Sequence, residues 1–186
     1  MKMFRNLVIM LTAASMVAMG CGGNSSTGGG GGGGFAASAT GANAAVTSSN
    51  AGSVIGLALG QAFTVMGQGF SLGLKPVTPV GTGVVNGTTS GTATFDGSAS
   101  SGASGSNISA TVTFDDFSNG NGVWMQGLLT IDLTLGTTGI SGTMTGDLNI
   151  AGDYQAEVSW DLTYTNSIPS GSFGVTSDGN TFTHTL

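Results

Sequence analysis

The feature that most constrains the fold is the alternation of apolar and polar side chains along residues 108–164. A period of two places successive side chains on opposite faces of a β-strand, so this stretch predicts four consecutive strands. The intervening Thr, Ser, Asp, Asn and Gln would form a face in contact with water, as in antiparallel sheets with one buried face. The residues expected on the apolar face are Val112, Phe114, Val123, Met125, Leu129, Ile131, Leu133, Ile140, Met144, Leu148, Ile150, Val158, Trp160, Leu162 and Tyr164.

Glycine-rich turns between these strands set the expected pairing of residues. A hairpin centred on residues 119–122 places Phe114 opposite Gly127, where an aromatic ring covers a glycine in a curved sheet. The next turn, at residues 136–139, places Leu135 opposite Ile140. The other expected pairs also keep apolar residues opposite one another. They are Val112–Leu129, Ala110–Ile131, Ile131–Met144, Leu148–Ala156, Met144–Trp160, Tyr164–Phe173 and Val175–Phe182.

Residues 50–66 show a different period, because apolar side chains recur there at spacings of three and four, with Ser49 or Asn50 available as the N-cap. This pattern predicts a helix that covers the apolar face of the sheet. Gly52, Gly56 and Gly60 form a separate stripe on it. The stripe either lets the helix lie close to the sheet or, as the alternative, packs against another helix in a membrane.

Two further strands are expected before residue 108. Ala93 and Phe95 mark one, and Val84 and Val85 a weaker one. The expected fold is therefore mainly β, an antiparallel up-and-down meander of about six to eight strands with one N-terminal helix. The sheet would be strongly curved or closed into a barrel, which would also protect its edges. A β-solenoid is the alternative architecture.

The start of the chain has the form of a secretory signal. Residues 1–20 contain Lys2 and Arg5 followed by an apolar run that is too short to span a bilayer. The segment ends in Val-Ala-Met-Gly-Cys, with the cysteine at position 21, and this ending resembles the lipobox of bacterial lipoproteins. The resemblance implies cleavage before Cys21, a diacylglycerol on its sulfur and an acyl chain on its amine. By the sorting pattern of that family, Gly22 in place of Asp implies the outer membrane.

The residues after Cys21 are expected to form a tether. Residues 21–49 are rich in Gly, Ser, Ala and Thr, and they cannot bury enough apolar surface to offset the entropy of ordering. A flexible chain of roughly 29 residues has a root-mean-square reach of about 30 Å. The expected organisation is thus a signal at 1–20, a lipidated tether at 21–49 and a β-rich domain at 50–186. That domain resembles the Gly/Thr-rich β-meander lipoproteins of bacteria.

The charge balance excludes some classes of partner. Removal of residues 1–20 leaves Lys75 against nine acidic residues. An acidic chain repels phosphate backbones, so nucleic-acid binding is not expected. Cys21 is the only cysteine, which excludes an internal disulfide and a Cys-based zinc cluster.

Candidate functional residues are few. Trp124 and Phe117 are expected to face outward together and could contact a ligand or a partner. Asp147 is expected opposite Glu157 on the polar face, where a cation could relieve their repulsion, although the preferred interpretation is a solvated face without metal. His184, the only histidine, is expected on the apolar side beside Phe173 and near Tyr164, with no nucleophile in register.

These observations predict a lipid-anchored envelope protein with a structural or binding role, without a cofactor and without enzymatic activity. The alternative is a carrier that holds a small apolar ligand inside the curved sheet. The residues expected to line such a ligand site are Phe114, Met125, Met144 and Trp160. The membrane would be the partner through Cys21, and no specific protein partner can be derived.

Overall fold

The computed structural model describes residues 39–73, 83–102 and 105–186, so the signal and Cys21 lie outside the described residues. The described chain forms one helix and nine strands, which confirms the mainly β class. The elements in chain order are β1 (Ala44–Ala45), α2 (Ala51–Gly73), β2 (Gly83–Asn86), β3 (Ser90–Gly102), β4 (Gly105–Ser118), β5 (Val123–Gly136), β6 (Gly139–Gly152), β7 (Tyr154–Thr165), β8 (Ile168–Ser177) and β9 (Asn180–Thr185).

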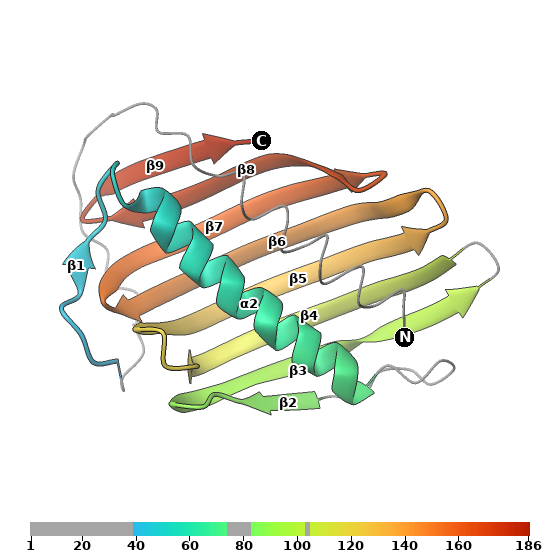
Figure 1. The fold of residues 1–186 in the computed structure, drawn as a ribbon, viewed down its shortest axis with the longest axis horizontal. Helices are drawn as coiled ribbons and strands as arrows, with labels where there is room; N and C mark the ends of the chain where they lie inside the picture. Colours follow the sequence, from blue (N-terminus) through green and yellow to red (C-terminus); the bar gives the residue numbers. More distant parts are fainter. Residues whose placement is uncertain (1–38, 74–82, 103–104) are drawn as a thin grey trace.

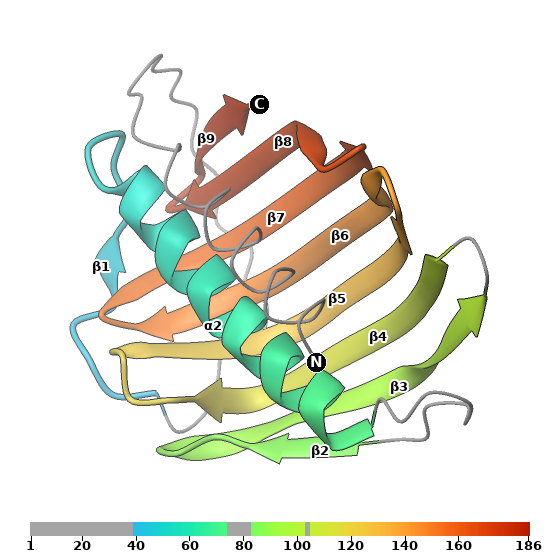
Figure 2. The same ribbon diagram turned by 45° about the vertical axis from the view of Figure 1, so that its right-hand side comes forward.

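The sheet is an up-and-down meander, as expected. Strands β2 to β9 lie side by side in the order of the sequence, and every neighbouring pair is antiparallel (Figure 1). This order excludes the solenoid alternative. Strands β2 and β9 are the two edges within the described residues, so the sheet is open and curved around α2 rather than closed (Figure 2).

The predicted registers of β4 with β5 and of β5 with β6 are confirmed. Phe114 pairs with Gly127 and Val112 with Leu129, and Leu135 pairs with Ile140 in the following hairpin. The pairs Ala110–Ile131 and Ile131–Met144 are also observed. The same holds near the end of the chain, where Val175 pairs with Phe182.

The registers on both sides of β7 differ from the prediction by an even number of residues. Leu148 pairs with Val158 rather than Ala156, and Met144 pairs with Leu162 rather than Trp160. Tyr164 pairs with Pro169, whereas Phe173 lies opposite Trp160. The turn before β8 falls at Asn166 and Ser167, whose φ angles of 51° and 69° form a tight hairpin two residues earlier than predicted.

Even slips leave the two faces of the sheet unchanged, because side chains alternate with a period of two. The fifteen side chains expected on the apolar face are all buried and belong to one hydrophobic core. The other face, called here the convex face, is polar and exposed. Its exposed residues include Thr113, Thr130, Asp132, Thr143, Thr145, Asp147, Ser159, Asp161 and Thr163.

Aromatic residues cover glycines on the buried face, called here the concave face. Gly127, opposite Phe114, has a φ of 137°, and a Cβ there would lie 2.3 Å from the carbonyl oxygen of Asp147. Only glycine permits this close approach of β5 to β6, which bends the sheet. The indole of Trp160 lies over Gly146 in the same way, with 2.3 Å between its Cε2 and a Cβ built on that glycine.

Helix α2 packs on the concave face, as expected, but it is longer than the predicted 50–66. It crosses the sheet obliquely, from the β7–β8 side to β2 (Figures 1 and 2). Gly67 and Gly69 lower helix propensity, but α2 continues past them to Gly73 and contacts β2. Among the described residues, no helix is long and apolar enough to cross a membrane.

The glycine stripe of α2 does not contact the sheet. Gly52, Gly56 and Gly60 are exposed, and a Cβ added to Gly56 or Gly60 would meet no atom within 4 Å. The interpretation in which the stripe lets the helix lie close to the sheet is therefore wrong. The helix approaches the sheet instead through Ala58, Ala62 and their neighbours, which are buried.

The expected tether is shorter than residues 21–49, because its last residues belong to the domain. Ala44 and Ala45 form β1, which pairs in parallel with Tyr154 and Gln155 at the start of β7. Val46 is 3% exposed, and its N–H donates to the hydroxyl of Ser177 at 3.1 Å. The ordered domain therefore begins before residue 50.

Candidate ligand-binding face

Phe117 is not an exposed contact residue, so that prediction is wrong. The pairs Phe114–Gly127 and Phe117–Met125 are three residues apart on β4 but only two residues apart on β5. This bulge, in which Asp116 has a φ of 52°, turns Phe117 to the concave face. Phe117 is fully buried there, and its ring packs edge-on against Phe114 with centroids 5.7 Å apart.

Trp124 keeps the outward parity that was predicted but is only 6% exposed. Its ring lies against Gly152, where an added Cβ would be 2.7 Å from Cε3. Asn43 is hydrogen-bonded to the same glycine in both directions, at 2.7 and 3.0 Å, so the segment before β1 passes beside it. Trp124 therefore closes one end of the sheet, and the expected Trp124–Phe117 contact surface does not exist.

The acidic residues of the convex face do not form a metal centre. Asp147 pairs with Ser159, and Glu157 pairs with Asn149, so the predicted opposition of the two acids is wrong. Both are exposed. No group of three or more His, Cys, Asp or Glu side chains suited to a metal ion occurs in the described part of the chain. The arrangement fits the solvated face that the sequence favoured.

His184 lies opposite Phe173, as expected from its position on β9. Tyr164, which was expected nearby, pairs with Pro169 of β8 rather than with Phe173. Among the described residues, the strand partner of His184 is therefore an aromatic residue.

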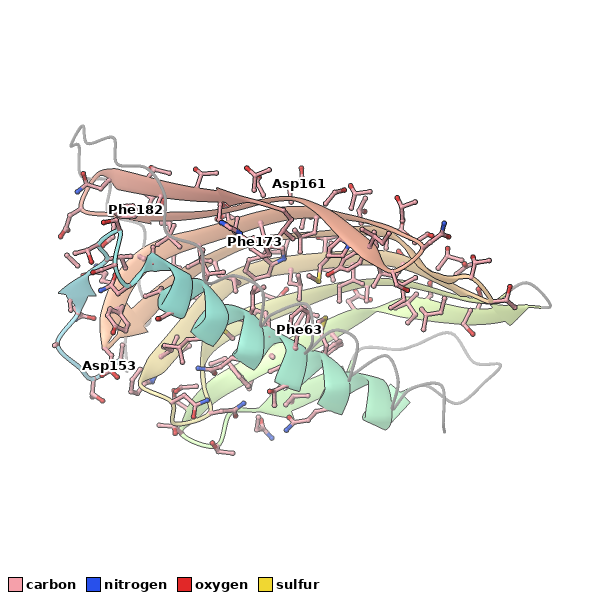
Figure 3. All side chains as sticks on the ribbon, turned by 45° about the horizontal axis from the view of Figure 1, so that its top comes forward. Phe63, Asp153, Asp161, Phe173 and Phe182 are labelled. Carbon is pink, nitrogen blue, oxygen red and sulfur yellow. The ribbon has the colours of Figure 1, made fainter. Side chains whose placement is uncertain are left out.

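The concave face is continuous and apolar, and its side chains form the core. Its side chains come from seven consecutive strands, β2 to β8, and nearly all are Val, Ile, Leu, Met or aromatic. In Figure 3, Phe63 of α2 and Phe173 of β8 lie on the helix side of the sheet, whereas Asp161 lies on the opposite side. Any ligand that contacted this face would therefore meet apolar side chains.

Helix α2 is held over one end of this face. Gln61 is 2% exposed, and its side-chain amide donates to the carbonyl oxygen of Val123 at 3.1 Å. Its side-chain oxygen accepts from the N–H of Asn119 at 3.4 Å. Both partners lie at the β4–β5 turn, so these bonds bind the middle of α2 to that end of the sheet.

The opposite end of the concave face has no described helix over it. There the C-terminal end of β5, the N-terminal end of β6 and the C-terminal end of β7 lie together (Figures 1 and 2). Leu133 pairs with Gly142, which in turn pairs with Tyr164. Leu135 is half-buried beside Ile140. We name this part of the face, with Leu133, Leu135, Ile140 and Tyr164, the open end.

Polar atoms on the concave side are rare. The indole N–H of Trp160 is buried and finds no hydrogen-bond acceptor among the described residues. Burial also raises the pKa of the Tyr164 phenol, two inward positions further along β7. The sequence placed both rings in the core, but alternation reports only which way a side chain points. Alternation does not indicate whether a buried hydrogen-bond donor has an acceptor.

Comparison with known proteins adds no assignment: no family model, no curated protein and no solved structure matches the chain. The function is therefore argued from the sequence and the geometry of the fold.

Proposed function

We propose that the protein is a lipid-anchored component of the bacterial envelope, held at the outer membrane by Cys21, with a binding rather than a catalytic role. The ligand would be a small apolar molecule carried on the concave face of the curved sheet. The observation that supports this proposal is the concave face itself, which is continuous and apolar over seven strands and has no described helix over one of its ends.

The energetics of ligand binding concern the open end. Apolar side chains exposed to water cost about 25 cal/mol per Å², so a domain gains by covering them with its own chain or with a ligand. At the open end Leu133, Ile140 and Tyr164 are 5–6% exposed and Leu135 is half-buried, so a ligand would insert among packed side chains rather than cover an exposed patch. Among the described elements, α2 contacts β2, β5, β7 and β8 but leaves the open end without a helix. An apolar ligand there would complete the layer that α2 begins.

The binding test uses the chain from residue 21 onward with Cys21→Ser, so that no lipid is attached. A fluorescent naphthylamine probe should bind saturably, with one probe per chain. Leu135→Asp places a charge on the open end at a half-buried position and should abolish binding. Thr134→Asp, one residue away on the convex face, is the matched control and should bind normally. Equal loss in both variants, or no saturable binding, contradicts the proposed site.

The anchor is tested separately. Mass spectrometry of the N-terminal peptide from the natural membrane protein should find Cys21 carrying a diacylglyceryl group and an N-acyl chain. Cys21→Ser should lack both modifications, and the protein should leave the membrane fraction. An unmodified Cys21 in the mature protein would refute the lipoprotein assignment without affecting the ligand site.

A further inference from the structure

Strand β9 is an unprotected edge of the sheet. Among the described residues its one strand partner is β8, and β9 lies at the margin of the sheet (Figures 1 and 2). Natural edge strands usually carry Lys, Pro, a bulge or an inward charge, which prevents pairing with another chain. β9 reads Asn-Thr-Phe-Thr-His-Thr, without Lys, Pro, an acidic residue or a break in its register with β8. This edge can therefore accept a further strand.

The bonding of β9 to β8 shows which of its residues face outward. Asp178 and Gly179, with φ angles of 49° and 74°, form the two-residue turn that begins the hairpin. At its other end, the N–H of Leu186 donates to the carbonyl oxygen of Gly171 at 3.0 Å. Hydrogen-bonded pairs alternate along an antiparallel ladder, so the even-numbered residues of β9 bond to β8. The backbone N–H and C=O groups of the odd-numbered residues therefore point away from the sheet.

The outward residues are Thr181, Thr183 and Thr185, and all three are exposed. Within the described part of the chain, no strand pairs with them on that side. The other edge, β2, has four residues, so only two of them can face outward. β9 thus offers the longer ladder for a partner strand.

The sequence of β9 is complementary to itself about Thr183. When two copies of β9 run antiparallel with Thr183 opposite Thr183, Thr181 of each copy lies opposite Thr185 of the other. Every one of these pairs joins residues whose backbone groups face outward, so each pair exchanges two hydrogen bonds. Their side chains form Thr–Thr pairs, which are favourable across strands. A two-fold axis closes such a contact, so it produces a dimer rather than a fibre.

The same register is compatible with the concave side and with the charge of the domain. It places Phe182 opposite His184 of the other copy, and both side chains are half-buried in the single chain. Phe182 packs at the margin of the core, so a second copy would cover the part of its ring that remains exposed. Acidic domains repel one another, and β9 would join them through a strand that contains no acidic residue.

We propose that two copies of this chain pair through β9, antiparallel about a two-fold axis at Thr183, and join their open sheets into one continuous sheet. The partner is a second copy because the outward backbone groups, the side chains and the charge of β9 are all self-complementary. This inference goes beyond the ligand and the anchor and depends on neither. A single strand pair buries little surface, so the dimer belongs to the weak, reversible class.

Disulfide cross-linking tests the contact. The chain from residue 21 onward with Cys21→Ser has no thiol, so one introduced cysteine reports one position. Thr183→Cys should form a covalent dimer under mild oxidation, because opposed Cα atoms about 5.5 Å apart are within the range of a disulfide. Thr163→Cys, exposed on β7, is the matched control and should remain monomeric.

Two more cysteine variants test the register. Thr181→Cys and Thr185→Cys should each cross-link poorly alone, because the two copies of either residue would lie four residues apart, or about 13 Å along the strands. A mixture of the two variants should form the covalent dimer. Equal yields from the mixture and from either variant alone would refute this register.

Sedimentation of the chain without introduced cysteines provides the second readout, and a reversible monomer–dimer equilibrium is expected. Thr183→Lys places two like charges opposite one another and should raise the Kd of dimerisation by about tenfold or more. Thr163→Lys adds the same charge away from β9 and should leave that Kd unchanged.

The outcomes are decisive for the dimer alone. A covalent yield from Thr183→Cys no higher than from Thr163→Cys refutes pairing through β9, and so does dimerisation that Thr183→Lys leaves intact. Growth beyond the dimer, as pairing of β9 with β2 of the next copy would produce, contradicts the two-fold axis. The substituted residues are exposed and lie off the concave face, so failure here would leave the proposed ligand site and anchor untouched.

Discussion

The concave and convex faces of the sheet are built from the same strands, and they use their residues in opposite ways. Along β5, Leu129, Ile131 and Leu133 are at most 5% exposed, while the intervening Thr130 and Asp132 are exposed. The concave side chains touch many neighbours in a close-packed core. The convex side chains mostly contact water, so their identity matters little for folding.

We therefore expect stability and curvature to depend mainly on the concave face. The convex face contains Thr, Ser and acids that keep the sheet soluble. The concave face contains the large side chains, the glycines that bend the strands and the one unexplained donor. A substitution should therefore be judged first by its face and only then by its chemistry.

The largest contrast is expected between neighbouring residues of β4. Phe114 is 1% exposed, and Phe114→Ala should lower the free energy of unfolding by roughly 3–5 kcal/mol, the usual cost of emptying a buried aromatic position. Thr113→Ala, on the convex face, should cost well under 1 kcal/mol. Denaturant melts of both variants provide the measurement. Similar costs at 113 and 114 would break the comparison of the two faces.

The glycines that curve the sheet should be nearly as sensitive. Gly127→Ala forces a side chain onto a φ of 137° and against the carbonyl oxygen of Asp147, so it should cost about 2–3 kcal/mol. Gly56→Ala, on the exposed side of α2, is the control, for which the change in the free energy of unfolding should have the opposite sign. It meets no atom and should stabilise the domain by up to about 1 kcal/mol. Thermal melts that ranked the two substitutions alike would argue against glycine-based curvature.

Alkaline pH should reveal the buried phenol of the open end. Burial raises the pKa of Tyr164 above its ordinary value, so the folded state keeps this phenol neutral where the unfolded chain ionises it. The associated stability is complete below pH about 10 and is lost as the pH rises through the folded-state pKa. Tyr164→Phe should reduce this loss of stability, measured in urea melts at about pH 9–11. Thr163→Ala should show the same pH dependence of stability as the unsubstituted protein. Stability of the Thr163→Ala variant that did not change with pH would contradict the assignment of the effect to Tyr164.

The smallest effect is expected for calcium on the convex face. Millimolar calcium should shift the melting temperature by no more than about 1–2 °C, because six to eight oxygen ligands are needed and the exposed acids are not clustered. Asp147→Asn should be equally mild with and without calcium. A large upward shift that this substitution abolishes would mean that the convex face holds a specific metal site.

The sequence alone was sufficient to predict which side chains point to the core. Alternation assigned the fifteen core side chains correctly, and the glycine turns after β4 and β5 set two hairpin registers, because both signals are local. Alternation cannot detect an even slip, since a shift by two residues leaves every side chain on its face. That is why the registers around β7 were missed while the faces were right.

Only the tertiary structure decided the parts of the candidate site that depend on contacts between distant segments. The bulge at Asp116 inserts one residue and turns Phe117 inward, which no period-two pattern can anticipate. The burial of Trp124 accompanies the docking of Asn43 on Gly152, more than a hundred residues away. The oblique path of α2, held by Gln61, leaves one end of the concave face without a described helix over it. Local propensity specifies a helix or a strand, but the packing of one against the other fixes where a ligand could lie, because packing minimises the apolar area left in contact with water.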